Sequence, residues 1–203
     1  MASGREENVL VDETFRITSM MEVTMWDENS QEMRQSARFD IEQMRQLATT
    51  AHLIMKPDGT FSLSIKPLQV SFSKTGDHSY SETQSLNISG VEIEGRGELS
   101  RNDNWISLAI TSMTCSTIAE RHKGKTVSSD SFHEFDSDYK YDLLEQQTAL
   151  TYSKNGYGNV NRFAISLKMR QTGTLKTRYN EEDSMDTLDL DETKTMEFEG
   201  VSQ

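Results

Sequence analysis

Apolar and polar residues alternate along much of this chain, and this pattern restricts its fold more than any other feature of the sequence. Between residues 9 and 25 the apolar positions of one parity are Phe15, Ile17, Met21, Val23 and Met25. Residues 60–65 and 105–111 repeat the same period. A period of two residues is typical of a β-strand with one buried and one exposed face. The sequence therefore predicts a mostly β protein.

Turn-forming residues separate the alternating segments. Asp58-Gly59, Asn102-Asp103 and Asn155-Gly156 each lie between two predicted strands, and they predict three hairpins. Pro67 lacks a backbone donor, so residues 68–72 are expected to form a separate or edge strand. We expect about ten strands, in either an up-and-down antiparallel barrel or a two-sheet sandwich, because both show the same alternation.

Two polar stretches interrupt the alternation. Residues 73–85 and 121–138 are rich in Ser, Thr, Lys and acidic residues, and we expect loops there, the second with a short strand at 132–135. Residues 86–94 resemble one strand whose parity shifts at Ser89-Gly90, which predicts a β-bulge.

Residues 40–51 follow a helical period instead. Ile41, Met44 and Leu47 recur at a spacing of three, and Asp40 suits the N-cap position. This pattern predicts one short amphipathic helix of about three turns, covering one face of the β domain.

The length of 203 residues fits one large domain or two very small ones, and no internal repeat or linker is visible. We expect a disordered N-terminus at residues 1–8, a single β domain at 9–199 and a C-terminal tail at 200–203. Hydrophobic residues make up 34% of the chain, which predicts a modest core and a strongly polar exterior.

The chain is acidic, with 33 acidic and 21 basic residues and a formal net charge of −12. Such a chain repels nucleic-acid phosphates and anionic lipids, so we expect no nucleic-acid partner. No stretch approaches the roughly 20 apolar residues that span a bilayer, which predicts a soluble domain without a transmembrane segment. Its compartment stays open: cytoplasmic as written, or secreted or periplasmic if residues 1–4 replace an export signal.

Residues suited to catalysis do not form a known pattern. Cys115 is the single cysteine, so no intramolecular disulfide can form, and we expect a buried thiol. The four histidines do not pair at metal-ligand spacing. Gly95-Arg96-Gly97 lacks the further glycine and the following helix of a nucleotide site. The sequence therefore predicts no cofactor and a non-enzymatic protein.

Two acidic clusters are the remaining candidates for a metal site. His133 precedes three carboxylates within residues 134–138, where a divalent metal is conceivable but a solvated acidic loop is the simpler interpretation. Residues 186–192 form the second cluster, with Asp189 and Asp191 expected on one face of a strand. We interpret this cluster as charge that protects a sheet edge rather than as a calcium site, and we predict no metal.

Methionine is frequent, with 11 residues in the chain, and it is concentrated in the first 55 residues. Core packing is the simpler interpretation, whereas a soft lining for a lipid-like ligand or a contact face for another chain is the functional one. The residues predicted to contact an apolar ligand lie on the first strands and the expected helix. They are Met21, Met25, Met44, Leu47, Phe61 and Leu63.

One part of the chain resembles small bacterial lipocalin-like domains. A helical segment at 41–47 precedes Asp58-Gly59-Thr60-Phe61, and Gly95-Arg96-Gly97 precedes the alternating segment that begins at Trp105. The resemblance covers about residues 40–112, and it implies an up-and-down antiparallel barrel. The Gly-x-Trp motif of lipocalins is missing near the first strand, where Trp26 has no glycine two residues before it. No functional residue carries over.

Two classes of function fit these patterns. The first is a non-enzymatic binding module, a β-barrel holding a small apolar or lipid-like ligand. The alternative is a structural or protein-interaction domain that assembles through a sheet edge or face. An enzyme is supported only by the acidic clusters. A ligand barrel should leave space inside, whereas an assembly domain should fill its core and expose an apolar patch.

Overall fold

The computed structural model describes residues 9–27, 32–36, 49–76, 79–145, 149–155, 160–180 and 184–202. Within these ranges, thirteen strands form one antiparallel sheet. The strands are β1 Val11–Asp27, β2 Glu32–Ser36, β3 Thr50–Met55, β4 Thr60–Ile65, β5 Leu68–Thr75, β6 Ser81–Ile88, β7 Val91–Arg101, β8 Trp105–Cys115, β9 Ile118–Val127, β10 Phe132–Glu145, β11 Ala149–Ser153, β12 Arg162–Tyr179 and β13 Asp186–Ser202.

Eight of these strands close into a barrel. The order is β1-β3-β4-β7-β8-β11-β12-β13, and β13 pairs with β1 to complete the ring. All neighbouring strands are antiparallel, so the barrel is an up-and-down meander. The chain leaves the barrel between some of these strands to form the part of the sheet described next. The barrel prediction is confirmed, and the sandwich alternative does not apply.

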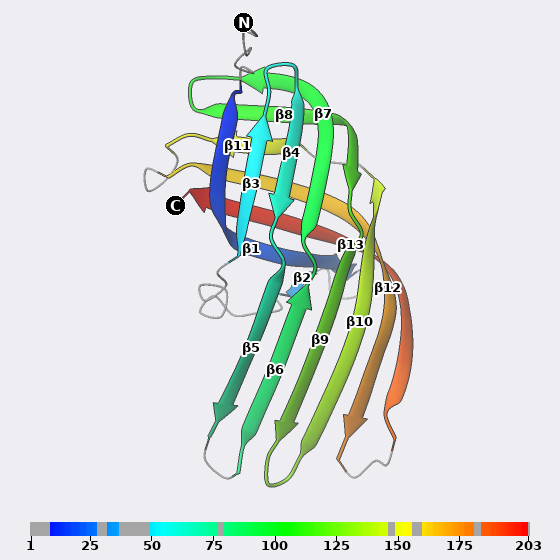
Figure 1. Ribbon diagram of the computed structural model, residues 1–203. Coiled ribbons are helices and arrows are strands. Elements are labelled where there is room, and N and C mark those ends of the chain that lie inside the picture. The colour runs from blue at the N-terminus through cyan, green and yellow to red at the C-terminus, as the bar shows by residue number, and fades with distance from the viewer. Residues whose placement is uncertain are drawn as a thin grey trace, which may run out of the picture.

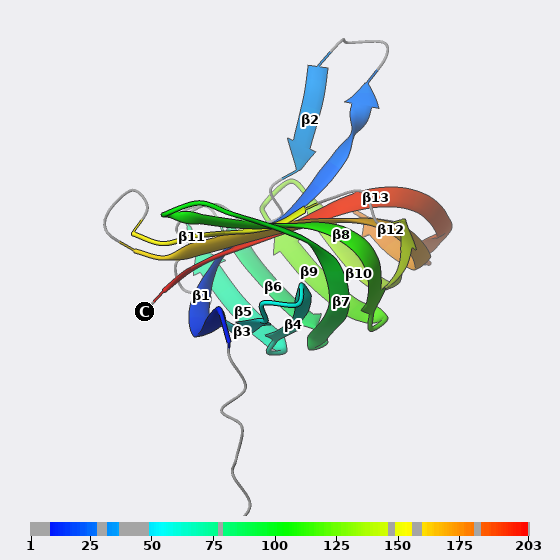
Figure 2. The same cartoon turned by 90° about the horizontal axis from the view of Figure 1, so that it is seen from above.

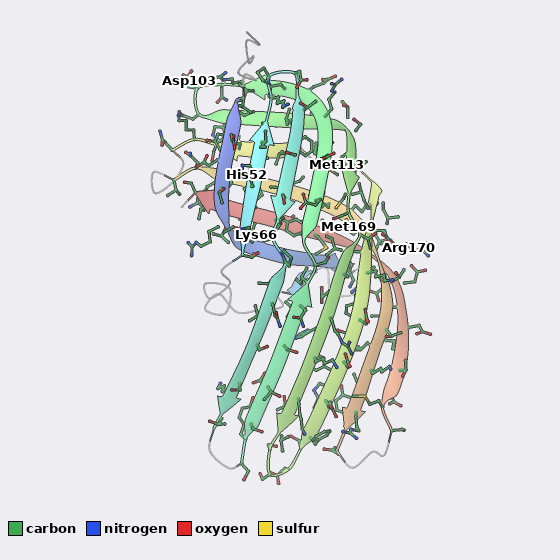
Figure 3. All side chains as sticks on the ribbon, in the orientation of Figure 1. His52, Lys66, Asp103, Met113, Met169 and Arg170 are labelled. Carbon is green, nitrogen blue, oxygen red and sulfur yellow. The ribbon has the colours of Figure 1, made fainter. Side chains whose placement is uncertain are left out.

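Beyond the barrel, the sheet continues as a single open layer (Figure 1). The chain passes from β4 to β5 at Lys66-Pro67, from β6 to β7 at Ser89-Gly90 and from β8 to β9 at Ser116-Thr117. The layer consists of β5, β6, β9, β10 and the adjoining halves of β12 and β13, and we call it the open sheet. Figure 3 labels Lys66 at one of the breaks and Met169 where β12 leaves the barrel.

Two barrel strands have no counterpart in the open sheet. Strand β3 begins at Thr50, level with the β4–β5 break, where the Lys66 amide donates to the Thr50 carbonyl. Strand β1 pairs with β13 only as far as Val23 and Thr195, and its far end pairs with β2 instead. This β1–β2 hairpin stands away from the body of the molecule (Figure 2). The open sheet is therefore the continuation of six of the eight barrel strands.

The hairpin predictions are confirmed. Asp58-Gly59 joins β3 to β4, Asn102-Asp103 joins β7 to β8, and β11 pairs with β12 across Asn155-Gly156. Pro67 does separate β4 from β5, as predicted. At the first turn, the Asp58 carboxylate accepts hydrogen bonds from the amide and hydroxyl of Thr60, and these bonds lower the pKa of Asp58.

The two predicted loops are wrong, because most of each is strand. Residues 73–85 belong largely to β5 and β6, and residues 121–138 largely to β9 and β10. One face of these strands is solvent-exposed and polar, and the other mixes polar with apolar residues, so the alternation is weak. The predicted bulge at Ser89-Gly90 is also wrong, since the chain leaves the open sheet there and β7 begins in the barrel.

The predicted chain ends and helix need correction where the structure describes them. Residues 40–48 of the expected helix and residues 1–8 lie outside the described ranges, but Thr50 and Ala51 belong to β3, so no helix reaches residue 51. The expected tail at 200–203 is strand as far as Ser202, because Gly200 and Val201 still pair with β1 and β12.

Apolar side chains from all eight barrel strands fill the barrel interior. One residue of each strand, at most 2% exposed, illustrates this packing: Phe15, Leu53, Leu63, Ile93, Leu108, Leu150, Phe163 and Phe198. The rings of Phe15 and Phe163 meet edge to face, with centroids 5.0 Å apart. Gly200 lies opposite Phe163, where a Cβ atom would come within 2.3 Å of that ring. The interior is therefore close-packed.

A polar cluster lies at the barrel end farthest from the open sheet. The Glu13 carboxylate accepts hydrogen bonds from the Tyr152 hydroxyl at 3.1 Å and from the Asn161 side-chain amide at 2.9 and 3.0 Å. Burial and the neighbouring Glu13 carboxylate raise the pKa of Tyr152 to about 12. Tyr152 therefore stays a neutral donor that satisfies the carboxylate.

Candidate functional site

Register assigns every side chain of the open sheet to one of two faces. Along β12 the inward residues Phe163 and Met169 are followed, at steps of two, by Gln171 and Leu175. The barrel interior therefore continues as one face of the open sheet, which we call the inner face. The other face, which continues the barrel exterior, is the outer face.

Next to the barrel, the inner face is buried and holds a polar network. The Tyr141 hydroxyl donates to Glu120 Oε2 at 3.1 Å and accepts from the Gln171 side-chain amide at 2.9 Å. All three side chains are at most 3% exposed. A buried carboxylate needs such partners, so these bonds help hold β9, β10 and β12 in register.

Farther from the barrel, four rings lie side by side on the inner face across β9, β10 and β12. His122 meets Phe135 edge to face at 4.8 Å, and His133 stacks on Tyr179 at 4.5 Å with the rings 12° from parallel. Phe135 also lies over Gly124 on β9, where a Cβ atom would approach the ring to 2.2 Å. These rings form a contiguous aromatic surface.

Polar side chains of β6 border this aromatic surface. Glu82 accepts hydrogen bonds from the Tyr80 hydroxyl at 2.7 Å and from the Gln84 amide at 2.6 Å, and Gln84 also contacts His122 at 3.2 Å. The hydrogen bond to Glu82 raises the pKa of Tyr80. The buried Nε2 of His133 has no hydrogen-bond partner within the described residues. Buried nitrogens rarely lack a partner in folded proteins, and this one lies on the inner face.

The far part of the inner face exposes apolar side chains to solvent among polar ones. Leu188 is 56% exposed and Tyr179 is 49% exposed, and they belong to β13 and β12. Leu175 and Leu190, on the same face, are half-buried, as is Val70 on β5. An exposed apolar face of this kind is typical of a surface that contacts another molecule.

The outer face is polar, and opposite charges alternate from strand to strand. Asp136 on β10 pairs with Arg121 at 3.2 Å and Lys123 at 2.9 Å on β9, and Arg170 on β12 pairs with Asp191 on β13 at 2.6 Å. Partial burial opposes the effect, but the hydrogen bonds from Arg121 and Lys123 lower the pKa of Asp136. The hydrogen bond from Arg170 lowers the pKa of Asp191. These pairs link neighbouring strands of the outer face.

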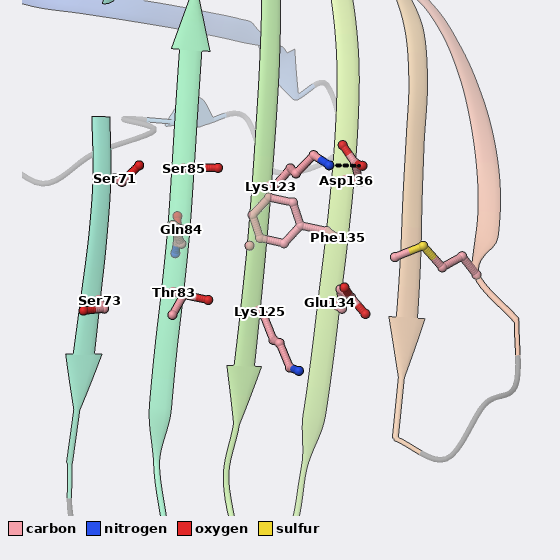
Figure 4. Close-up of a pocket in the computed structure, with 12 residues that line it drawn as sticks. Ser71, Ser73, Thr83, Gln84, Ser85, Lys123, Lys125, Glu134, Phe135 and Asp136 are labelled. Carbon is pink, nitrogen blue, oxygen red and sulfur yellow. Dashed lines mark ion pairs between the residues drawn. The ribbon is translucent and has the colours of Figure 1, made fainter. Parts of the chain in front are cut away.

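A shallow groove of about 670 Å³ crosses the outer face over β5, β6, β9 and β10 (Figure 4). Lys123 reaches across it to Asp136. The groove is lined mainly by hydroxyls and ammonium groups, which include Ser71, Ser73, Thr83, Ser85, Lys123 and Lys125. It is therefore a hydrated, polar surface, unlike the inner face.

The structure describes the side chains of two of the six predicted ligand-contacting residues. Phe61 and Leu63 are 4% and 0% exposed and belong to the packed barrel core. The side chains of Met21 and Met25, and residues Met44 and Leu47, lie outside the described part of the structure. For those four residues, ligand contact stays a prediction.

The predicted candidates for metal and thiol chemistry can be placed on the sheet. His133 points to the inner face whereas Glu134 and Asp136 point to the outer face, so these residues cannot share a metal ion. Asp189 and Asp191 share the outer face, as predicted. Among the described residues, no group of three His, Cys, Asp or Glu side chains could hold a metal. Burial, reinforced by Asp142, raises the pKa of Cys115 to about 11, so its thiol is protonated at neutral pH.

Sequence reasoning missed the aromatic surface of the inner face. The alternation of His133, Phe135, Ser137 and Tyr139 was the available signal, but it lies inside a stretch that the polar composition assigns to a loop. Gly124, which makes room for Phe135, gives no signal until the register of β9 and β10 is known.

Within the described part of the chain, no helix has the length and apolar character needed to cross a membrane. In comparisons with known proteins, no family model, no curated protein and no solved structure matches this chain.

Proposed function

We propose that this protein is a non-enzymatic interaction domain that binds another polypeptide on the inner face of the open sheet. The observation that carries the proposal is the solvent exposure of Tyr179 and Leu188, near the half-buried Phe135, on a sheet over which the described strands form no second layer. A single-layer sheet with one apolar face gains stability when a partner covers that face. The packed barrel then serves as the rigid support for this surface.

The shape of the surface favours a polypeptide over a small molecule. Small-molecule sites are concave and enclose most of the ligand, whereas the far inner face is a broad, open layer of rings and leucines. Aromatic residues are also enriched at the centres of protein interfaces. Close contact between Phe15, Phe163 and Gly200 inside the barrel also supports this choice.

A selection experiment tests the proposal. The purified full chain would be used to select binders from a display library of random peptides and small protein fragments. We expect binders whose affinity falls about tenfold or more, or 1.4 kcal/mol, when the inner-face variant Leu188→Asp replaces the wild type. The matched control is Thr187→Asp, which places the same charge one residue away on the outer face of β13.

Two outcomes would overturn the proposal. One is a failure to select any binder from libraries that yield binders to other domains. The other is a set of binders that tolerate Leu188→Asp and Tyr179→Asp as well as they tolerate Thr187→Asp. Because Leu188 and Tyr179 are about half exposed, neither aspartate variant is expected to unfold the domain.

A second candidate is the predicted lipocalin-like module with an apolar ligand in its barrel. The eight-stranded up-and-down closure favours it, because lipocalin-like domains share that topology. Native mass spectrometry of freshly purified protein tests this candidate. A bound adduct of lipid mass would support it, and a spectrum with only the mass of the chain would contradict it.

A further inference from the structure

The open sheet has two free edges within the described residues. Strand β5 pairs with β6 on one side and with no strand on the other. At the opposite edge, residues 186–194 of β13 pair only with β12, because β1 leaves β13 after the Val23–Thr195 pair. Each edge presents unpaired backbone groups that can accept a further strand.

The two free edges differ in their charge. The free part of β13, residues 186–194, carries four acidic residues and one basic residue, a composition that guards an edge against pairing with an identical strand. Strand β5, Leu-Gln-Val-Ser-Phe-Ser-Lys-Thr, has a single charged residue, Lys74. Its neighbours β6 and β9 carry two acidic and three basic residues. In a chain of net charge −12, the β5 edge is therefore a region without excess negative charge.

We propose that β5 is the edge through which two copies of this chain join, by antiparallel pairing of β5 with β5 of the second copy. The inference rests on the proposed function and names one partner for the open sheet. A two-fold axis perpendicular to the sheet places even-numbered residues of one β5 opposite even-numbered residues of the other, and odd opposite odd. The inner faces of the two copies therefore lie on the same side of the joined sheet. The joined sheet then presents one continuous apolar face across both copies.

Side chains on β5 are compatible with this self-pairing. The outer face of β5 consists of Gln69, Ser71, Ser73 and Thr75, so neutral residues would face neutral residues across the axis. The inner face includes Leu68 and Val70, which would extend the apolar surface. Equivalent pairing through β13 would instead set Asp189 and Asp191 near their own copies, and like charges directly opposite are unfavourable.

Analytical ultracentrifugation of the full chain across a concentration series tests the proposal. We expect a monomer–dimer equilibrium in wild type at physiological salt, where the Debye length of about 8 Å screens the net charge. In a pairing centred on Ser71, this residue lies opposite its own copy, so the variant Ser71→Lys should weaken the dimer about tenfold or more by setting two like charges side by side. Its control is Ser85→Lys. Ser85 is the cross-strand neighbour of Ser71 on β6, so this variant adds the same charge on the same outer face but away from the free edge.

Mixing two charge variants makes the test specific for the edge. Ser71→Lys and Ser71→Asp should each form a dimer about tenfold or more weaker than that of wild type when alone, and a mixture of the two should recover a mixed dimer. A wild-type protein that stays monomeric at high concentration would overturn the inference, as would a dimer that Ser71→Lys leaves intact. Such a failure would leave the inner-face proposal standing, because Leu188→Asp tests binding to that face and does not alter the β5 edge.

Discussion

Aromatic rings lie over cross-strand glycines in both parts of the molecule. Phe163 covers Gly200 in the barrel, and Phe135 covers Gly124 in the open sheet. In each pair the ring occupies the space that a Cβ atom on the opposite strand would need. These glycines are required by packing against a ring and not by backbone conformation, because none of them has a positive φ.

The first residue-scale prediction concerns Gly200. Replacing it with alanine should destabilise the protein by about 1–3 kcal/mol, because the added methyl group meets the Phe163 ring and Phe15 Cβ at 2.3 and 2.9 Å. Urea unfolding measures the change. The control is Gly76→Ala at an exposed position, which should change the free energy of unfolding by less than about 0.5 kcal/mol. Equal effects of the two substitutions would contradict the packing argument.

A second residue-scale prediction concerns Cys115. Because its pKa is raised to about 11, only about one thiol in a thousand is a thiolate at pH 8. Labelling with a disulfide reagent should therefore be about tenfold or more slower in the folded protein than in guanidinium-unfolded protein, and it should accelerate as the pH rises toward 11. Equal rates in the two states would show that the thiol is neither buried nor perturbed.

Sequence reasoning placed single residues well where one face of a strand is apolar. Alternation predicted that Phe61, Leu63 and Ile65 share a face, and all three are buried together. It could not predict the burial of Glu120, because its partner Tyr141 lies 21 residues away, and Gln171, which donates to Tyr141, lies a further 30 residues on. The sheet register alone brings the three residues together.

At the scale of elements, cross-strand ion pairs take the place of a second layer on the outer face of the open sheet. Asp136 bridges β9 and β10, and Asp191 joins β13 to β12. Exposed ion pairs contribute little singly, but here they lie on successive strands of one layer. The open sheet is therefore expected to depend on pH more strongly than the barrel.

The element-scale prediction follows from the lowered pKa of Asp136. A carboxyl whose pKa is depressed in the folded state stabilises the protein above its unfolded pKa, near 3.8, and this contribution is lost as the pH falls through the folded pKa. Asp136→Asn should therefore lower the urea midpoint at pH 6, and the difference from wild type should shrink below pH 3.8. Asp130→Asn, in the exposed turn before β10, is the control and should show no such dependence.

Elements with clear turn residues were predicted, and elements with two polar faces were not. The three hairpins follow from Asp-Gly and Asn-Gly type turns, which fix the local geometry without reference to the rest of the chain. The parts of β5, β6 and β9 within residues 73–85 and 121–127 were missed because Ser, Thr and Lys occupy one face and Gln84 and His122 interrupt the other. Pairing with neighbours, not local preference, makes these segments strands.

At the scale of the whole molecule, one sheet serves two purposes. Where all eight strands are present the sheet closes around an apolar core. Beyond the point where β3 begins and β1 turns away from β13, the sheet stays open. An antiparallel β fold could be anticipated from the alternation, which leaves a barrel and a sandwich as alternatives. The open sheet could not be anticipated, because no local sequence signal indicates that six strands of the sheet extend beyond the other two.

The two parts should differ in local stability. Backbone amides of β3 and β4, paired on both sides and over the packed core, should exchange hydrogen about 100-fold more slowly than those of β5, which is paired on one side only. Hydrogen–deuterium exchange of the free, dilute protein measures this difference. Uniform protection across barrel and open sheet would contradict the division into a closed and an open part.

The central claim is that the inner face of the open sheet is the surface that binds another polypeptide. Hydrogen–deuterium exchange of the full chain, with and without a binder obtained by selection, tests it most directly. We predict that the binder slows exchange in β5 and in residues 171–190, and leaves the already protected strands β3 and β4 unchanged. A binder that protects the far end of the barrel near Glu13, and leaves the open sheet unaltered, would contradict the claim.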